Sequence, residues 1–301
     1  MGPIKPTSVF LVLALCASLV HAHESPEHTI EAINQHAQLT PAQLHQRAIA
    51  KRALNQHSSA ITDLTTAIQA APDQLGFRLE LARTQLEAGH NRNTLHTLAQ
   101  ALPLATTPEQ QAEIHQLRAE AYQALNQHQQ ALKSIQQAFQ LIPSGEIDWY
   151  LLRAHSQGHL GQHQQRIDDL ASGLKHHPSA VVKNHWIDAL IDAGSFHSAL
   201  VEINRELEDR RWTSSYLIKR ARSLQGLNRT QEATADLKTA LAEITARLNP
   251  QRPDLLLLAD QAVAYSLLGE QDQSARSIQQ LHAHHAPRWI ISRASRHIPN
   301  K

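Results

Sequence analysis

Residues 126–143 of this 301-residue chain read NQHQQALKSIQQAFQLIP. After the opening Asn, apolar residues recur at three- and four-residue steps until Pro143 ends the run, which is the pattern of an amphipathic helix that begins behind a turn. Variants of the same stretch occur along the chain. The turn residues of the seven copies are Asn55, Gly89, Asn126, Gly161, Gly194, Asn228 and Gly269.

The spacing of these turns shows that the copies are repeats. Successive turn residues are 34, 37, 35, 33, 34 and 41 positions apart. A second column, seven positions before each turn, keeps the same spacing and consists of Ala48, Ala82, Ala119, Ala154, Ile187, Ala221 and Ala262. The repeat therefore extends to both sides of the turn, and we predict two helices in each unit and essentially no strand.

The period and the turn chemistry resemble those of the tetratricopeptide repeat, over about residues 41–287. The small residues after the turn and the closing prolines match it as well, at Ala60, Ala131, Ala199, Ala233, Pro72, Pro143 and Pro178. The family's early Trp is replaced by residues such as Leu44, Arg78 and His115. The resemblance implies an all-α, right-handed solenoid of about seven stacked repeats with capping helices at its ends.

Helix starts are marked by capping residues. Thr40 and Thr107 each precede a Pro and stand three residues before a Gln, which predicts a capping box, and Ser25 precedes Pro26. The seven extra residues before the last repeat equal about two helical turns, so we expect a longer helix around residues 241–248.

The four expected segments follow from these signals. Residues 1–22 form a secretory signal peptide, 23–40 a leading helix, 41–286 the repeat array and 287–301 a capping helix and tail. In the last segment we expect Trp289 and Ile290 to face inward and Arg293 and Arg296 outward.

The first segment predicts export to the periplasm of a Gram-negative bacterium. Lys5 precedes an apolar run that is too short to span a membrane, and small residues stand before a cleavage site after Ala22. Cleavage would remove Cys16, so we expect no disulfide in the mature chain. It would also remove the apolar run, so we expect no transmembrane segment after cleavage.

The net charge of the chain argues against partners that are recognised mainly through a strongly charged protein surface. The sequence has 28 Lys and Arg against 27 Asp and Glu, and the loss of Lys5 makes the mature chain neutral when its histidines are neutral. Nothing here indicates binding to nucleic acid or to an anionic membrane. Of the 21 histidines, the 20 that remain after the loss of His21 instead predict a charge that becomes positive below a pH of about 6.5.

Most histidines have a structural interpretation. His57, His128 and His163 each stand two residues after a turn, where the next repeat has Phe196. We interpret them as polar substitutes for an aromatic ring at the corner between the two helices.

The first helices of the repeats would line a concave groove that binds a partner protein or peptide. The candidate residues of this groove are Arg83, Leu86, Glu120, His155, Asp188, Ile191 and Arg222.

The alternative function is histidine-based metal binding or buffering. His155 and His159 lie one turn apart, and Asp188 and Asp192 occupy equivalent places in the next repeat, so the four could suit zinc. Against this, Asp188 could simply form an ion pair with Arg222. We therefore favour no metal site and expect no cofactor.

No catalytic pattern stands out. The sequence shows no evident nucleophile and base set, no glycine-rich phosphate loop and no CxxC motif. We therefore expect a binding protein, with no enzymatic activity.

Overall fold

The computed structural model describes residues 25–208, 211–249 and 251–295, and the predicted signal peptide lies outside this part. Within the described residues the chain forms 16 α-helices and no strand, which confirms the predicted all-α repeat fold. The chain divides into two compact units, residues 1–156 and 157–301.

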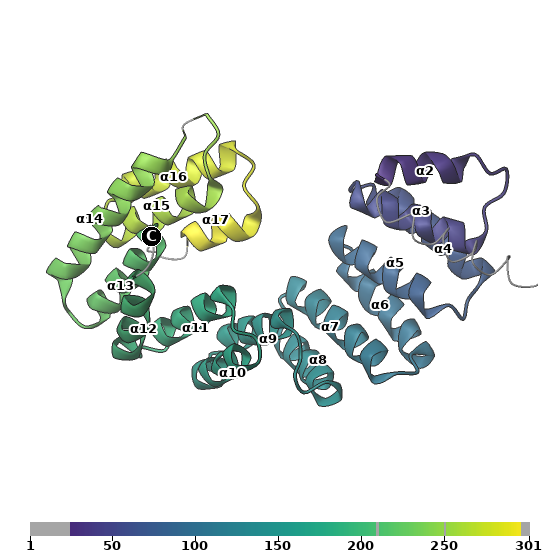
Figure 1. The fold of residues 1–301 in the computed structure, drawn as a ribbon, viewed down its shortest axis with the longest axis horizontal. Coiled ribbons are helices and arrows are strands. Elements are labelled where there is room, and N and C mark those ends of the chain that lie inside the picture. The colour runs from purple at the N-terminus through teal and green to yellow at the C-terminus, as the bar shows by residue number, and fades with distance from the viewer. Residues whose placement is uncertain (1–24, 209–210, 250, 296–301) are drawn as a thin grey trace, which may run out of the picture. The chain divides into compact units, whose positions relative to one another are not determined.

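The first unit contains a leading helix and successive helix pairs, drawn from purple to blue-green in Figure 1. In each pair the second helix packs against the first, and the first helix of the next pair packs against that second helix. The helices are α2 (Pro26–Asn34), α3 (Pro41–Ala53), α4 (His57–Ala70), α5 (Leu75–Glu87), α6 (Asn91–Ala101), the short 3-10 helix η2 (Leu102–Leu104), α7 (Pro108–Ala124), α8 (His128–Leu141) and most of α9 (Ile147–His159).

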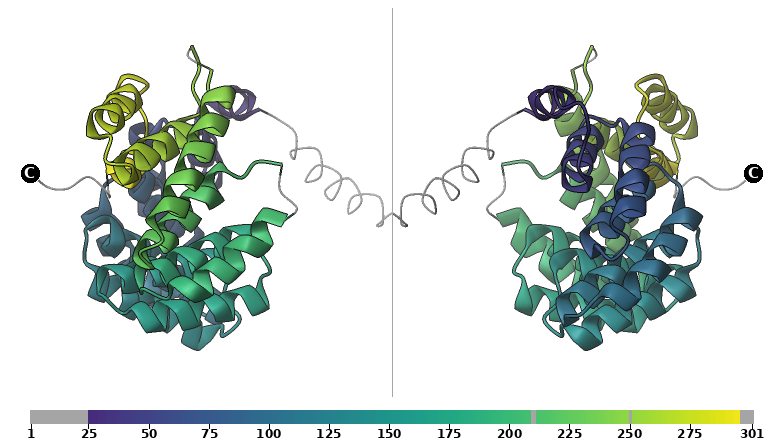
Figure 2. Two further views of the ribbon diagram at one scale, coloured as in Figure 1. Left: turned by 90° about the vertical axis from the view of Figure 1, so that its left-hand side faces the viewer. Right: turned by 90° about the vertical axis from the view of Figure 1, so that its right-hand side faces the viewer.

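The second unit begins inside α9 and repeats the same design, as the turned views in Figure 2 also show. Its helices are α10 (His163–His176), α11 (Ala180–Asp192), α12 (Phe196–Glu208), α13 (Ser214–Gly226), α14 (Thr230–Arg247), α15 (Leu255–Leu267), α16 (Gln271–Ala283) and α17 (Arg288–Ser295).

The seven predicted turn residues all adopt the left-handed backbone conformation, with φ between 58° and 81°. At the third turn the Gln127 amide donates to the Tyr122 carbonyl at 2.8 Å, and the Asn126 amide donates to the Gln123 carbonyl at 2.9 Å. The same two bonds close the other six turns, so every first helix ends in a Schellman motif. Gly and Asn stand here because they tolerate a positive φ better than other residues.

The predicted small-residue columns form the core. Every member of the column seven positions before the turn is buried, and so are Ala60, Ala131, Ala199 and Ala233 after the turn. A methyl group at these places lets two helix backbones approach closely, while Leu and Ile fill the space beside it. In the first unit, for example, Ile114 and Leu117 of α7 pack with Leu98 of α6.

The predicted caps are present. Thr40 and Thr107 each accept a hydrogen bond from the amide of the Gln three residues later, and that Gln bonds back, so both capping boxes form. Ser25 accepts from the His28 amide at 3.3 Å. The helix before the last repeat, α14, has 18 residues where α8 and α10 have 14, as the longer spacing predicts.

The orientation predicted for the last helix is partly wrong. Ile290 and Ala294 of α17 are buried, but the Trp289 side chain is 61 % exposed. Residues four apart lie on one helix face, whereas adjacent residues are about 100° apart, so Ile290 and Trp289 do not share the narrow face that α17 buries. Arg293 is half-buried and its guanidinium pairs with the buried Asp260, so it does not simply face outward, and Arg296 lies outside the described residues.

Candidate functional site

The first helices of neighbouring repeats contact one another within each unit, α3 with α5 and α5 with α7 in the first, and α11 with α13 and α13 with α15 in the second. We call the surface that these helices form in each unit the first-helix face. The predicted groove residues all stand on first helices.

Ion pairs connect α11 to α13 on the first-helix face of the second unit. Asp188 is 2.8 Å from Lys219 and 3.7 Å from Arg222. Asp192 is 2.9 Å from Arg222 and 2.9 Å from Arg166. The predicted pair of Asp188 with Arg222 is therefore present, as part of a larger network between helices.

These cations decide the charge state of Asp188. Burial alone would raise the pKa of its carboxyl, but Lys219 and Arg222 outweigh that effect and hold the pKa below its ordinary value. Lys219 also donates to the Asn184 carbonyl at 3.1 Å, so its ammonium is held in place. The network joins adjacent repeats rather than leaving charges open to a ligand.

The network continues to the end of the second unit. Arg293 of α17 donates a hydrogen bond to Asp260 of α15, which is buried. Burial raises the pKa of Asp260 more than Arg293 and Lys219 lower it. This carboxylate therefore ties the last helix to the last repeat.

The candidate metal ligands do not assemble. The carboxylates of Asp188 and Asp192 are engaged by cations, and His155 and His159 are exposed on α9. Among the residues that the structure describes, no group of three or more His, Cys, Asp or Glu side chains could hold a metal ion.

The first-helix face of the first unit has its own ion pairs. Arg52 of α3 is 2.6 Å from Glu80 and 2.7 Å from Glu87, both on α5. Arg83 of α5 pairs with Glu113 of α7 and lies 3.5 Å from Glu80. The pairs of Arg52 and the pair of Arg83 with Glu113 connect one first helix to the next, whereas Arg83 and Glu80 both lie on α5.

Glu120 differs from these charged residues. Its carboxylate accepts a hydrogen bond from the Gln116 amide at 3.0 Å, and Gln116 in turn accepts one from the Trp149 indole at 2.8 Å. Burial, with a smaller contribution from the charge of Asp148, raises the pKa of Glu120. Within the described part of the chain no cation lies within ion-pair distance of this carboxylate.

The remaining groove residues differ in their exposure to solvent. His155 is exposed, and its ring centroid lies 5.8 Å from that of His128. Leu86 is half-buried against the core of the first unit, and Ile191 is buried. Helix α11 contacts α10, α12 and α13 and buries three successive residues, 189–191. Because Ile191 is one of them, it does not line an open groove.

One polar column was not predicted from the sequence. Eight positions after each turn the residue is polar, and the members are Asp63, Thr97, Ser134, Asp169, Glu202, Asp236 and Ser277. Asp63 accepts hydrogen bonds from Arg47 and Lys51 of the paired helix, and Asp236 accepts two from Arg220 at 2.7 Å each. The polar character of all seven positions was visible in the sequence, and Asp63 and Asp236 use it to join the two helices of their repeats.

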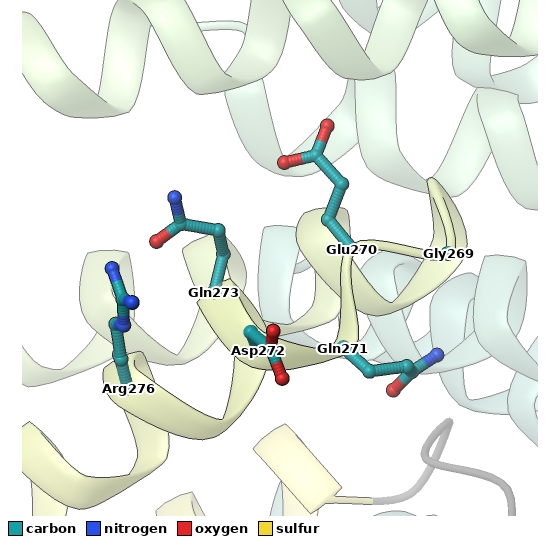
Figure 3. A pocket seen from close by; sticks show the side chains of 6 residues that line it. All are labelled: Gly269, Glu270, Gln271, Asp272, Gln273 and Arg276. Atoms are coloured by element: carbon teal, nitrogen blue, oxygen red, sulfur yellow. The ribbon is translucent and has the colours of Figure 1, made fainter.

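A surface hollow of about 440 Å³ lies at the turn between α15 and α16. Figure 3 shows its side chains spread along the surface, with Glu270 and Gln271 pointing in different directions. Its other lining residues are Gly269, Asp272, Gln273 and Arg276. No nucleophile with an adjacent base is among them, so the hollow does not resemble a catalytic site.

Among the described helices, none is both long and apolar enough to cross a membrane.

Comparison with known proteins agrees with this architecture. Residues 112–144, which include most of α7 and all of α8, match the family model of the tetratricopeptide repeat. A crystal structure of a tetratricopeptide repeat protein from Parabacteroides merdae is similar to 85 % of this chain and 98 % of its own, with a TM-score of 0.65 and 15 % identity. None of the curated proteins matches the sequence.

Two other solved structures are less similar. MamA from Desulfovibrio magneticus is 18 % identical over 59 % of this chain and 99 % of its own, with a TM-score of 0.49. A thermophilic tetratricopeptide repeat protein of Thermus thermophilus is 20 % identical over 62 % and 100 %, with a TM-score of 0.45. Residues 112–144 are thus matched to the tetratricopeptide repeat, and the seven Schellman turns and the buried small-residue columns agree with the fold of tetratricopeptide repeat proteins.

Proposed function

We propose that this protein is an exported interaction scaffold that binds a partner protein or peptide on its first-helix face. Folds of this type commonly serve as scaffolds for protein interaction. The described residues present neither a metal-binding group nor a catalytic set at the surface hollow, which agrees with a binding role.

The main support comes from the contrast between Glu120 and its neighbours. The other groove charges, on Arg83, Asp188 and Arg222, are already paired across helices. Glu120 is held only by Gln116, whose own orientation is set by the Trp149 indole. A fixed and partly enclosed carboxylate with open hydrogen-bonding capacity is suited to a donor group of a partner.

Binding on this face is tested in two stages. The partner is first captured from periplasmic extract with the mature protein and identified by mass spectrometry. Its affinity is then measured calorimetrically with the wild type, with Glu120→Gln and with Asp73→Asn, which removes an exposed charge from the loop after α4.

We expect Glu120→Gln to weaken binding about 10-fold or more, because hydrogen bonds to a charged group contribute roughly 1.5–3 kcal/mol. Asp73→Asn should leave the affinity unchanged. Equal affinities of all three proteins would show that the partner does not bind at Glu120 on α7.

Export to the periplasm rests on the sequence of residues 1–22 alone. Lys5, the short apolar run and the small residues before Ala22 support cleavage at that point. Amino-terminal sequencing of protein recovered from the periplasm should therefore begin at His23. A soluble cytoplasmic product that keeps Met1 would contradict the proposal.

A further inference from the structure

A histidine stands in the core of the first unit at a place that four of the other six repeats fill with a buried leucine or tyrosine. His115 lies eleven positions before the turn residue Asn126. The residues at the same place in four other repeats are buried, and they are Leu44, Tyr150, Leu217 and Leu258. The remaining two repeats have Arg78 and Lys183 there, and both are only half-buried. His115 itself is only 9 % exposed, so its imidazole takes the place of a core side chain.

The surroundings of this imidazole in the described structure offer no group that would stabilise its protonated, positively charged form. Its Nδ1 atom is buried and has no hydrogen-bond partner in the described structure. The one charged group that acts on the ring is the guanidinium of Arg118, on the same helix. Helices α5, α6 and α8 pack against α7, and α9 reaches it through the bond from Trp149 to Gln116. None of the described carboxylates of these four helices acts on the ring.

Protonation of such a ring is unfavourable in the folded state. Burial, and then repulsion from Arg118, lower the pKa of His115 below its ordinary value of 6.5. In the unfolded chain the same ring binds its proton at the ordinary pKa. The stability of the neutral core is therefore complete above about pH 6.5 and decreases as the pH falls through the lower folded pKa, since the unfolded state then binds more protons.

We propose that His115 makes the repeat formed by α7 and α8 acid-sensitive, so that this part of the first unit loosens when the surroundings become mildly acidic. Helix α7 also holds Gln116 and Glu120, so loosening it would release a partner bound at those residues. That consequence rests on the proposed function. The acid sensitivity itself does not, because it belongs to the free protein.

Other titrating groups nearby must be separated from His115. His45 lies against Phe77 at 4.9 Å, and burial lowers its pKa in spite of the opposing charge of Glu80. The raised pKa of Glu120 has the opposite effect on stability, because the folded protein then gains protons as the pH falls. A substitution at His115 isolates its share, since the other groups remain in place.

The test compares the wild type with His115→Leu, His115→Gln and the matched control His96→Leu, which replaces an exposed histidine of α6. Hydrogen exchange of the amides of α7 and α8, corrected for intrinsic rates, is measured between pH 7.5 and 5 without any partner. One proton bound on opening increases the opening equilibrium by at most about 10-fold per pH unit. The wild type and His96→Leu should lose protection in acid by the same factor.

His115→Leu should lose clearly less protection than the wild type, and so should His115→Gln, which stays polar but cannot titrate. If His115→Leu disturbs the fold, the Gln variant together with an NMR titration of the His115 ring in the wild type decides the question. A His115 pKa at or above 6.5 in the folded protein would overturn the proposal. Equal acid sensitivity in the wild type and both His115 variants would overturn it too.

Discussion

At the scale of single residues, the turn between the two helices of a repeat determines where each first helix ends. Asn55, Asn126 and Asn228 adopt a positive φ in turns where the other four repeats have Gly. Asn tolerates this conformation because its short polar side chain bonds locally, whereas a β-branched side chain is strained there.

Replacement of Asn126 by Val should therefore destabilise the protein by about 1–2 kcal/mol, and replacement by Gly should change stability by only a few tenths. Urea unfolding followed by circular dichroism measures both. Gln136→Val, on the exposed side of α8, controls for the lower helix propensity of Val. A cost at Asn126 no larger than that of the control would show that the turn does not require the left-handed conformation.

At the scale of elements, burial depends on how many neighbours a helix has. Helix α11 contacts three other helices and buries Ala189, Leu190 and Ile191 in succession. Helix α17 contacts only α15 and α16 among the strongly packed helices of its unit, and its buried residues are Ile290 and Ala294. The buried face of a terminal helix is therefore narrow, and that of an internal helix is wide.

This difference predicts opposite outcomes at two adjacent positions. Ile290→Ala should cost about 2–4 kcal/mol, because it opens a cavity against Leu258 and Leu281. Trp289→Ala should cost less than about 1 kcal/mol, since the side chain is already largely in solvent. Thermal unfolding of the two variants is the measurement, and a Trp289 variant that melts as early as the Ile290 variant would contradict the orientation of α17.

At the scale of the whole molecule, the formal net charge of only +1 conceals ordered charge pairing within each unit. Arg222 is the clearest case, because its side chain is 16 % exposed and it contacts two carboxylates on the preceding first helix. Replacement of such a residue affects the packing of adjacent repeats more than it affects an open binding surface.

Arg222→Glu should accordingly destabilise the second unit by roughly 1–3 kcal/mol, since it places a third negative charge beside Asp188 and Asp192. Because repeats interact mainly with their nearest neighbours, hydrogen exchange should increase in α11 and α13 and stay unchanged in α5 and α7. Arg205→Glu, at an exposed position of α12, serves as the control. Uniform exchange across both units, or a variant as stable as the wild type, would exclude this role.

The sequence by itself determined the helices, their caps, their turns and the buried alanine columns. These features depend on contacts within about four residues and on a period that repeats seven times. The local sequence therefore suffices to predict them, as at Thr107 and Asn126. It also correctly indicated that Asp188 meets Arg222, because equivalent positions on adjacent repeats lie side by side.

Only the tertiary structure decided which candidate residues are open and which are occupied. Ile191 is buried and Trp289 exposed because the number of neighbouring helices, and not the local pattern, sets the width of a buried face. The partners of Lys219, Gln116 and Asp63 likewise depend on how helices distant in sequence are placed. Hydrogen bonds and ion pairs act over a few ångströms, so the exact packing of the helices selects each partner.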